Sequence, residues 1–353
     1  MKKLIKTFLR TWFAIKSIEF RSIFSRLDKN SDNIVILYPN FPKGILRYFY
    51  ADALVNDVAL VNATAQNVGS LRIKIGTRNL NKLIEKNIFL NVSNRYNSHG
   101  FRNYANSLKY FILQLEDQAN RVFPNSYEVE WWENKVFMHR EFDKIGIKTP
   151  ETTIIDLDNL DINLLPYAYP FLIKEIHSAG SNGVHKVNTI EDVKNIIYND
   201  KIRKSNRYLL LQKLLNMDRD LRVIVVGDKI VLHYWRINAT KEWQPTSTKH
   251  GSTVDFDFFP EEWRAHIIAE FQKLKITTGA FDLVWENNDY SQTPFVLEIS
   301  PSYQPNPVPL KNLKTSYGAY KSGFSFFDSW DARFVVVVQR IKNELVAAWL
   351  KKP

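Results

Sequence analysis

Apolar and polar positions follow two different periods along this chain, and the periods separate expected strands from expected helices. Apolar, β-branched runs of about four to eight residues between turn-forming residues are typical of buried strands. The first run, Asn33–Tyr38, predicts the opening strand of an α/β domain. Further strands are expected at Thr152–Ile155, Phe171–Lys174, Gly183–Val187, Tyr208–Gln212, Leu221–Val226, Lys229–Trp235, Ala280–Trp285 and Phe295–Ile299.

Longer segments whose apolar residues recur at helical spacing predict helices between and after these strands. Gly227-Asp228 predicts a hairpin turn, and the Pro-rich segment Pro301–Pro309 is expected to be extended. The alternation of helices and strands indicates a mixed α/β (α+β) fold. Helices are expected at Ile45–Leu54, Ser126–Phe142, Ile190–Tyr198, Pro260–Leu274 and Ala332–Leu350.

Residues 1–27 form a basic amphipathic segment. Leu4, Phe8, Trp12 and Ile15 follow helical spacing, and Lys or Arg interrupts the apolar residues repeatedly. Without a continuous apolar region or a small-residue cleavage site, the segment does not resemble a secretory signal. Two interpretations stay open: the helix lies in a membrane interface, or it packs on its own protein through the same face.

The amino-acid composition limits the kinds of catalytic and metal-binding site that the chain can form. The 353 residues are enough for two or three domains. The absence of Cys excludes disulfides, thiolate metal sites and a Cys nucleophile, and it is typical of a reducing compartment, so we expect a cytoplasmic protein. A net charge of +11 predicts attraction to anions such as nucleotides, nucleic acids, acidic glycans or a membrane face, without choosing among them.

A glycine-containing loop follows one expected strand. The strand ends at Lys174, and Gly180-Ser181-Asn182-Gly183 leads into the next strand. Glycines let backbone N–H groups approach phosphate oxygens, and a lysine adds a point charge. The loop is not a Walker A motif, because no Gly-Lys-Ser/Thr follows. A plain hairpin is the alternative.

Two acids and two arginines lie in expected strands. Asp282 and Glu298 are flanked by apolar residues, so we expect both to be partly buried. Carboxylates on neighbouring strands form a hard-oxygen site suited to Mg²⁺. Arg222 and Arg236 lie on adjacent expected strands and are candidates to bind one phosphate or acyl-phosphate. The alternative is solvated strand charges.

Taken in order over about residues 126–308, these segments resemble the ATP-grasp superfamily, especially the ribosomal-protein glutamate ligases and, more distantly, D-alanine–D-alanine ligase. The resemblance implies an ATP-grasp fold preceded by a small α/β domain, and the residue pattern at the two ends of the chain predicts amphipathic terminal helices beside it. It rests on Glu133-Asn-Lys135, Phe171-Leu-Ile-Lys174, Gly180-Ser-Asn-Gly183, Leu211-Gln212, Asp220-Leu-Arg222, Arg236, Gly251, Asp282 and Glu298-Ile-Ser-Pro301.

The resemblance also implies a division of the chain and a role for each site residue. The division is 1–27, a basic helix; 28–125, an N-terminal α/β domain; 126–210 and 211–310, the two ATP-grasp subdomains; and 311–353, a helical extension. By the resemblance, Lys135 and Lys174 contact the ATP phosphates, and the loop Gly180, Ser181, Asn182 and Gly183 closes over them. Gln212, Lys213 and Leu214 contact the adenine, and Asp220 contacts the ribose. Mg²⁺ is bound by Asp282, Glu298 and Ser300, while Arg222 and Arg236 stabilise the transferring phosphoryl group.

Two positions depart from the family pattern: Lys213 stands where a Glu is usual, and Ser300 where the metal motif usually ends in Asn. The implied function is an ATP-dependent, Mg²⁺-using carboxylate–amine ligase that works through an acyl-phosphate on a small-molecule or glycan-linked acid and an amine. The alternatives are a kinase of the same fold acting on a hydroxyl, and a non-catalytic module that binds membranes or nucleic acid. Nothing resembles an RNA-recognition motif or a zinc finger, so nucleic acid is not expected. Residues 1–27 and 332–352 predict peripheral contact at the inner face of a membrane.

Overall fold

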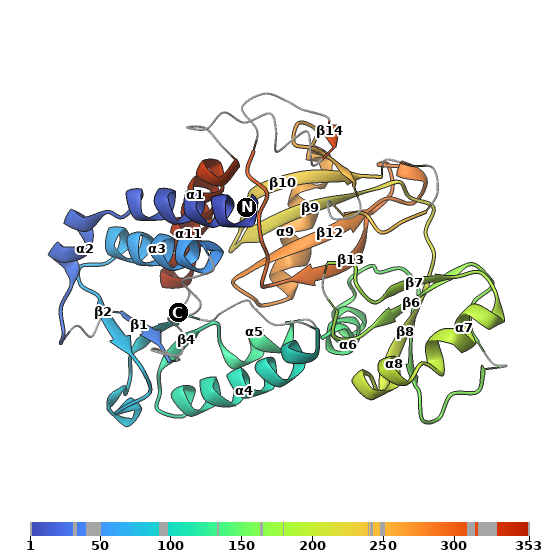
Figure 1. The fold of residues 1–353 in the computed structure, drawn as a ribbon, viewed down its shortest axis with the longest axis horizontal. Helices are drawn as coiled ribbons and strands as arrows, with labels where there is room; N and C mark the ends of the chain where they lie inside the picture. The colour runs from blue at the N-terminus through green and yellow to red at the C-terminus, as the bar shows by residue number, and fades with distance from the viewer. Residues whose placement is uncertain are drawn as a thin grey trace.

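The structure is a computed structural model that describes residues 2–30, 34–39, 51–91, 98–132, 134–162, 165–178, 180–238, 240, 243–247, 251–308, 315–316 and 330–351. Within these residues the chain forms three β-sheets, with helices packed on them (Figure 1). In Figure 1 the first sheet lies at the lower left, and the other two sheets lie beside each other on the right.

The first sheet is parallel and has four strands in the order β2-β1-β3-β4. Strand β1 is apolar throughout because both of its faces are covered. Val35 and Leu37 pack with residues of α4, and Ile36 packs with residues of α3 and α11. The elements are β1 Val35–Tyr38, α3 Ala51–Asn67, β2 Arg72–Ile75, the 3₁₀ turn η2 Leu80–Lys82, β3 Asn87–Leu90, α4 Ser98–Glu116 and β4 Arg121–Phe123.

The second sheet is antiparallel, with the order β5-β8-β6-β7. Its strands alternate, so Phe171 and Ile173 face the helix α7 while Leu172 and Lys174 face the other way. The elements are β5 Thr152–Asp156, β6 Phe171–Glu175, β7 Val184–Val187, α7 Ile190–Ile197, α8 Asp200–Ser205 and β8 Tyr208–Lys213.

The third sheet is antiparallel and has six strands in the order β13-β12-β9-β10-β11-β14. One face packs on α9 through residues such as Val223 and Phe281, and part of the other face packs on α11 through Ile224 and Val226. The elements are β9 Arg219–Val226, β10 Lys229–Ile237, β11 Thr253–Asp255, η5 Glu261–Trp263, α9 Arg264–Lys273, β12 Thr278–Val284, η6 Glu286–Asn288, β13 Phe295–Ser300 and β14 Thr315–Ser316.

Helices from the two ends of the chain pack together. The helix α1 (Lys2–Lys16) is followed by α2 (Phe20–Arg26), and α1 lies beside α3 and α11 (Trp330–Lys351) (Figure 1). The apolar side chains of α11 are mostly buried, and Trp349 packs on Phe89. The three aromatic side chains of α11, Trp330, Phe334 and Trp349, are buried, so this helix gives no support to the expected membrane contact of residues 332–352, which stays a prediction. No helix among the described residues is long and apolar enough to cross a bilayer.

Each strand expected between Thr152 and Ile299 is present, and the Gly227-Asp228 turn joins β9 to β10 as expected. The expected single helix Ser126–Phe142 is wrong: it is two helices, α5 (Ser126–Glu130) and α6 (Lys135–Ile145). The break has a local cause, because the side chain of Asn134 accepts the backbone N–H of Phe137 and starts a new helix. Residues 45–50 of the expected helix Ile45–Leu54 lie outside the described residues.

The division of the chain into domains stays a prediction. The expected boundary between 210 and 211 falls inside β8, which hydrogen-bonds to β5 and β6 along its length.

Candidate active site

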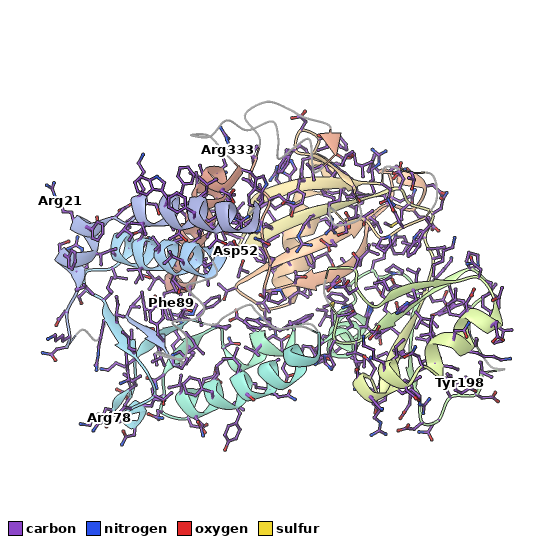
Figure 2. All side chains as sticks on the ribbon, viewed as in Figure 1. Arg21, Asp52, Arg78, Phe89, Tyr198 and Arg333 are labelled. Carbon is purple, nitrogen blue, oxygen red and sulfur yellow. The ribbon has the colours of Figure 1, made fainter. Side chains whose placement is uncertain are left out.

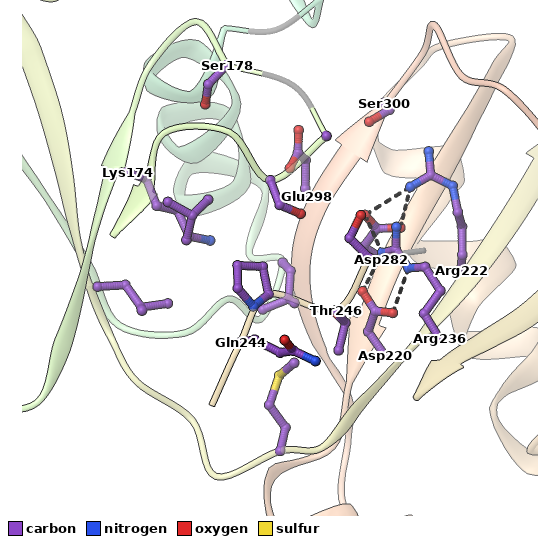
Figure 3. A pocket seen from close by; sticks show the side chains of 18 of the residues that line it. Lys174, Ser178, Asp220, Arg222, Arg236, Gln244, Thr246, Asp282, Glu298 and Ser300 are labelled. Atoms are coloured by element: carbon purple, nitrogen blue, oxygen red, sulfur yellow. Dashed lines mark hydrogen bonds and ion pairs between the residues drawn. The ribbon is translucent and has the colours of Figure 1, made fainter. Parts of the chain in front are cut away.

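A pocket of about 480 Å³ lies between the second and third sheets, and the sequence-predicted residues converge on it (Figure 3). All of them line the pocket except Gly183, which lies next to the lining residue Val184. The lining predicted residues are Lys135, Lys174, Gly180, Ser181, Asn182, Gln212, Lys213, Leu214, Asp220, Arg222, Arg236, Asp282, Glu298 and Ser300. Glu133 lies outside the described residues.

The register of the third sheet builds one wall of the pocket. Tyr234, Arg222, Asp282 and Glu298 lie opposite one another on β10, β9, β12 and β13, in a single row across four strands. Residues directly opposite in an antiparallel pair present their side chains on the same face. On the same face of β9, Ile224 and Val226 pack on α11. The helix does not extend over Arg222, so the charged residues begin where the apolar contact with α11 ends.

Ion pairs neutralise this row. Arg222 Nη1 donates to both carboxylate oxygens of Asp282, at 3.0 and 3.1 Å. Arg236 Nη2 lies 2.9 Å from Asp282 Oδ2. Arg236 Nε also donates to Asp220 Oδ1 at 2.8 Å (Figure 3). Asp220 is only 1% exposed, and burial raises its pKa while Arg236 opposes that effect. The ribose contact implied for Asp220 would require this pair to separate.

Two lysines form the opposite wall. Lys174 is the penultimate residue of β6 and lies on the face that points away from α7, and Lys135 is the first residue of α6. Lys135 Nζ donates to the carbonyl oxygen of Ser178 at 2.6 Å and lies 3.7 Å from Glu298 Oε1. No described residue is a hydrogen-bond acceptor for Lys174 Nζ. A buried ammonium group without an acceptor, beside a helix N-terminus and a second lysine, is suited to an anion.

Burial changes the protonation chemistry of this wall. Burial is the main reason that the pKa of Lys174 is lowered to about 8; the charge of Lys135 contributes to the decrease, whereas Glu298 and Asp282 oppose it. Behind the lysines, burial and the charges of Lys174 and Lys135 lower the pKa of His139 to about 3. His139 is therefore neutral at physiological pH and adds no further positive charge.

The loop from Ile176 to Gly183 borders the pocket, and its glycines have separate functions. Gly180 and Gly183 both have positive φ, at +62° and +71°. A Cβ at Gly183 would lie 2.9 Å from Glu175 Cβ, whereas one at Gly180 would meet nothing within 4 Å. Glu175 in turn contacts His185 and Asn206, at 3.3 and 3.1 Å. The base of the loop is therefore tightly packed, and its tip is open.

The donors present fit a magnesium ion bound together with phosphate. Asp282 and Glu298 lie opposite each other and supply hard carboxylate oxygens, with the hydroxyl of Ser300 two residues further on β13. Within the described residues no cluster of three or more His, Cys, Asp or Glu side chains is present. One or two carboxylates together with water and phosphate oxygens are the usual ligands of Mg²⁺ in nucleotide sites. Asp282 would exchange arginine contacts for a metal contact.

Tyr234, Tyr303 and the segment 243–247 also line the pocket, and the sequence did not identify them as individual site residues. Tyr234 precedes Arg236 by two residues, so strand alternation alone places both on one face. Tyr303 is half-buried, and its hydroxyl lies 2.7 Å from Thr278 Oγ1. The sequence predicts residues Asn238–Gly251 as a candidate lid of the site, and residues 243–247 of this segment line the pocket.

Comparisons with known proteins agree with this architecture. No protein-family model matches the chain. A stretch of 120 residues, 33% of this chain, is 27% identical to the formate-dependent phosphoribosylglycinamide formyltransferase of Prochlorococcus marinus subsp. pastoris and spans 30% of that protein.

Two solved structures are similar over most of the chain. The D-alanine–D-alanine ligase of Bacillus anthracis complexed with ATP matches 89% of this chain and 99% of its own, with a TM-score of 0.51 and 14% identity. A RimK domain ATP-grasp protein of Sphaerobacter thermophilus matches 88% of this chain and 98% of its own, with a TM-score of 0.51 and 13% identity. The similarity at such low identity concerns the fold, and this chain has the ATP-grasp fold.

Proposed function

We propose that this protein is an ATP-dependent ligase that joins a carboxylic acid to an amine. The observation that carries the proposal is the convergence of two buried lysines and two opposed carboxylates on one pocket between two antiparallel sheets. Lysines at that position bind an anion of high charge, and the carboxylates bind the cation that accompanies it. Nucleoside triphosphate with Mg²⁺ meets both requirements.

The similar proteins support a carboxylic acid as one substrate. The name of one similar protein specifies formate, and that of another specifies D-alanine. The alternative enzyme predicted from the sequence is a kinase of the same fold that phosphorylates a hydroxyl. A glycan-linked acid and a cytoplasmic location likewise remain predictions from the sequence.

In the proposed reaction, a carboxylate oxygen of the acid attacks the γ-phosphorus of ATP, and the bond to ADP breaks. The amine then attacks the acyl carbon, and phosphate leaves. Mg²⁺ held by Asp282, Glu298 and Ser300 would neutralise phosphate charge. Lys135 and Lys174 hold the phosphates, because both ammonium groups lie on the wall that faces the carboxylates.

Arg222 and Arg236 face the developing negative charge of the acyl group, provided that they release Asp282 and Asp220. The loop at Gly180 excludes water, which would otherwise hydrolyse the acyl-phosphate. The open space around Gly180 leaves room for this closure.

A screen of acids against amines tests the proposal. The purified full chain is incubated with ATP, Mg²⁺ and pairs of candidate acids and amines, and ADP release is measured with mass spectrometry of the products. We expect stoichiometric ADP only when an acid and an amine are both present, with an amide as the product. Phosphorylation of a hydroxyl compound would support the kinase instead.

Variants connect the activity to the pocket. Lys174→Ala and Glu298→Gln should each lower the rate of ADP release by at least about a hundredfold, because each removes a charge that balances the transferring phosphoryl group. Lys229→Ala is the matched control, since Lys229 forms an exposed ion pair with Glu344 far from the pocket. Full activity of both pocket variants would exclude this site as the catalytic centre.

A further inference from the structure

The N-terminal helix α1 has two distinct apolar faces. Arg10, Phe13 and Ala14 point into the molecule, where Phe13 and Ala14 join the core formed with α3 and α11. Phe8, Trp12 and Ile15 lie on the opposite side at helical spacing and are 66%, 55% and 48% exposed. Intramolecular packing therefore accounts for one face of the helix and leaves the second face in water.

The second helix continues the exposed apolar surface. Phe20 and Phe24 are both exposed, and their rings stack with centroids 6.1 Å apart. Leu27, directly after α2, is exposed as well. We call these six side chains of residues 8–27 the outer aromatic face. A third of the large apolar side chains exposed among the described residues lie in this short stretch, so it differs from the scattered exposure that is normal for a soluble surface.

Cations accompany the outer aromatic face. Lys16, Arg21, Arg26 and Lys29 are exposed in the same segment, and Figure 2 shows Arg21 projecting away from the molecule. The acidic residues nearby are Asp28, which is exposed, and Glu19, which accepts a hydrogen bond from Gln66. Cations therefore outnumber acids two to one over residues 15–30, and the surface is complementary to anions.

Exposed aromatic rings beside basic residues fit a particular partner. Aromatic side chains are stable at the boundary between lipid headgroups and acyl chains, and lysine and arginine are attracted to anionic headgroups. Packing of the inner face of α1 on α3 and α11 fixes the outer face in place, so little ordering is needed on binding. We propose that the outer aromatic face of α1 and α2 docks this protein on an anionic phospholipid surface.

Vesicle flotation of the full chain tests the proposal. The probes are vesicles of phosphatidylcholine alone and of phosphatidylcholine with an equal amount of phosphatidylglycerol. We expect flotation with the anionic vesicles and loss of it at high salt, where screening weakens the attraction. Equal flotation with both vesicles, or flotation with neither, would overturn the proposal.

Point variants locate the contact without removing the helix. The double variant Trp12→Ser, Phe24→Ser and the double variant Arg21→Glu, Arg26→Glu should each lower the vesicle-bound fraction relative to the free fraction by at least about tenfold. Tyr110→Ser is the matched control, because Tyr110 is an equally exposed aromatic residue on α4. Unchanged binding by both double variants would contradict the proposal.

Two further measurements separate lipid from other partners. Tryptophan emission should shift to the blue on binding of anionic vesicles, and Trp12→Phe should retain flotation but lose most of that shift. Sedimentation velocity without vesicles tests whether the partner is a second copy of the chain. A wild-type dimer that the double variant Trp12→Ser, Phe24→Ser converts to a monomer would overturn docking on lipid. Circular dichroism of every variant checks that the fold is retained.

Discussion

Lys174 shows how one buried side chain relates the fold to the chemistry of the pocket. Its strand ends at the pocket, it is 8% exposed, and burial lowers the pKa of its ammonium group to about 8. Below that pH the group is charged and attracts phosphate; above it the group is neutral in the free protein. Bound phosphate would raise the pKa again, so binding above pH 8 must take up a proton.

The pH dependence of ATP binding tests this account. Affinity should be nearly constant below the pKa of about 8 and should then fall by up to about tenfold for each further pH unit. Isothermal titration in buffers of different ionisation enthalpy should detect the proton uptake. Lys174→Arg stays charged throughout this range, so its profile should be flat; an equally steep profile would assign the titration to another group.

Substitution of Gly183 and of Gly180 by Ala distinguishes the cost of backbone strain from the cost of a packing clash in the loop. Each has positive φ, so Ala at either position introduces strain of about 1–2 kcal/mol. Only Gly183 also faces a Cβ of Glu175 at 2.9 Å, which forces the base of the loop to shift. Gly183→Ala should therefore lower the free energy of unfolding by about 3 kcal/mol, and Gly180→Ala by about 1 kcal/mol. Urea unfolding measures both, and equal losses would contradict the packing argument.

At the scale of elements, the two ends of the chain depend on each other. Arg10 on α1 is 1% exposed and forms ion pairs with Asp52 of α3 and Asp331 of α11. Its guanidinium also lies 4.6 Å from the ring centroids of Trp330 and Phe334. The amphipathic pattern of α1 and α11 predicted that both helices have an apolar face. No local pattern specifies the contacts of Arg10 with α11, because they join residues more than 300 positions apart.

Arg10→Met should destabilise the protein by about 3 kcal/mol, because it leaves two partly buried carboxylates without their cation. The matched control is Lys229→Met, which breaks the more exposed pair with Glu344 and should cost about 0–1 kcal/mol. Both values follow from urea unfolding at neutral pH. Similar losses for the two variants would mean that the Arg10 cluster does not stabilise the helix packing.

At the scale of the whole molecule, the candidate site depends on the approach of two sheets. Lys174 and Gln212 come from the second sheet, and Asp282 and Glu298 come from the third. The outer aromatic face lies on α1 and α2, and none of its residues lines the pocket. The helix α1 is held in place by its contacts with α3 and α11. Lipid binding and ATP binding should therefore be separable by the variants described above.

The sequence by itself determined the residue types of the site and the strands that carry them. Local pattern is sufficient there, because these apolar runs are short, rich in β-branched residues and bounded by turn residues, which together favour strands over helices. A charged residue within such a run is visible directly. The break between α5 and α6 was missed, since the cap at Asn134 competes with a continuous apolar spacing.

Only the tertiary structure decided which charges meet. Strand register places Asp282 opposite both Arg222 and Glu298, and register depends on pairing between segments far apart in the chain. The same holds for α1: its sequence predicted one apolar face with two possible partners. The fold shows that the helix has two such faces, because Phe13 and Ala14 pack into the core while Phe8, Trp12 and Ile15 stay outside.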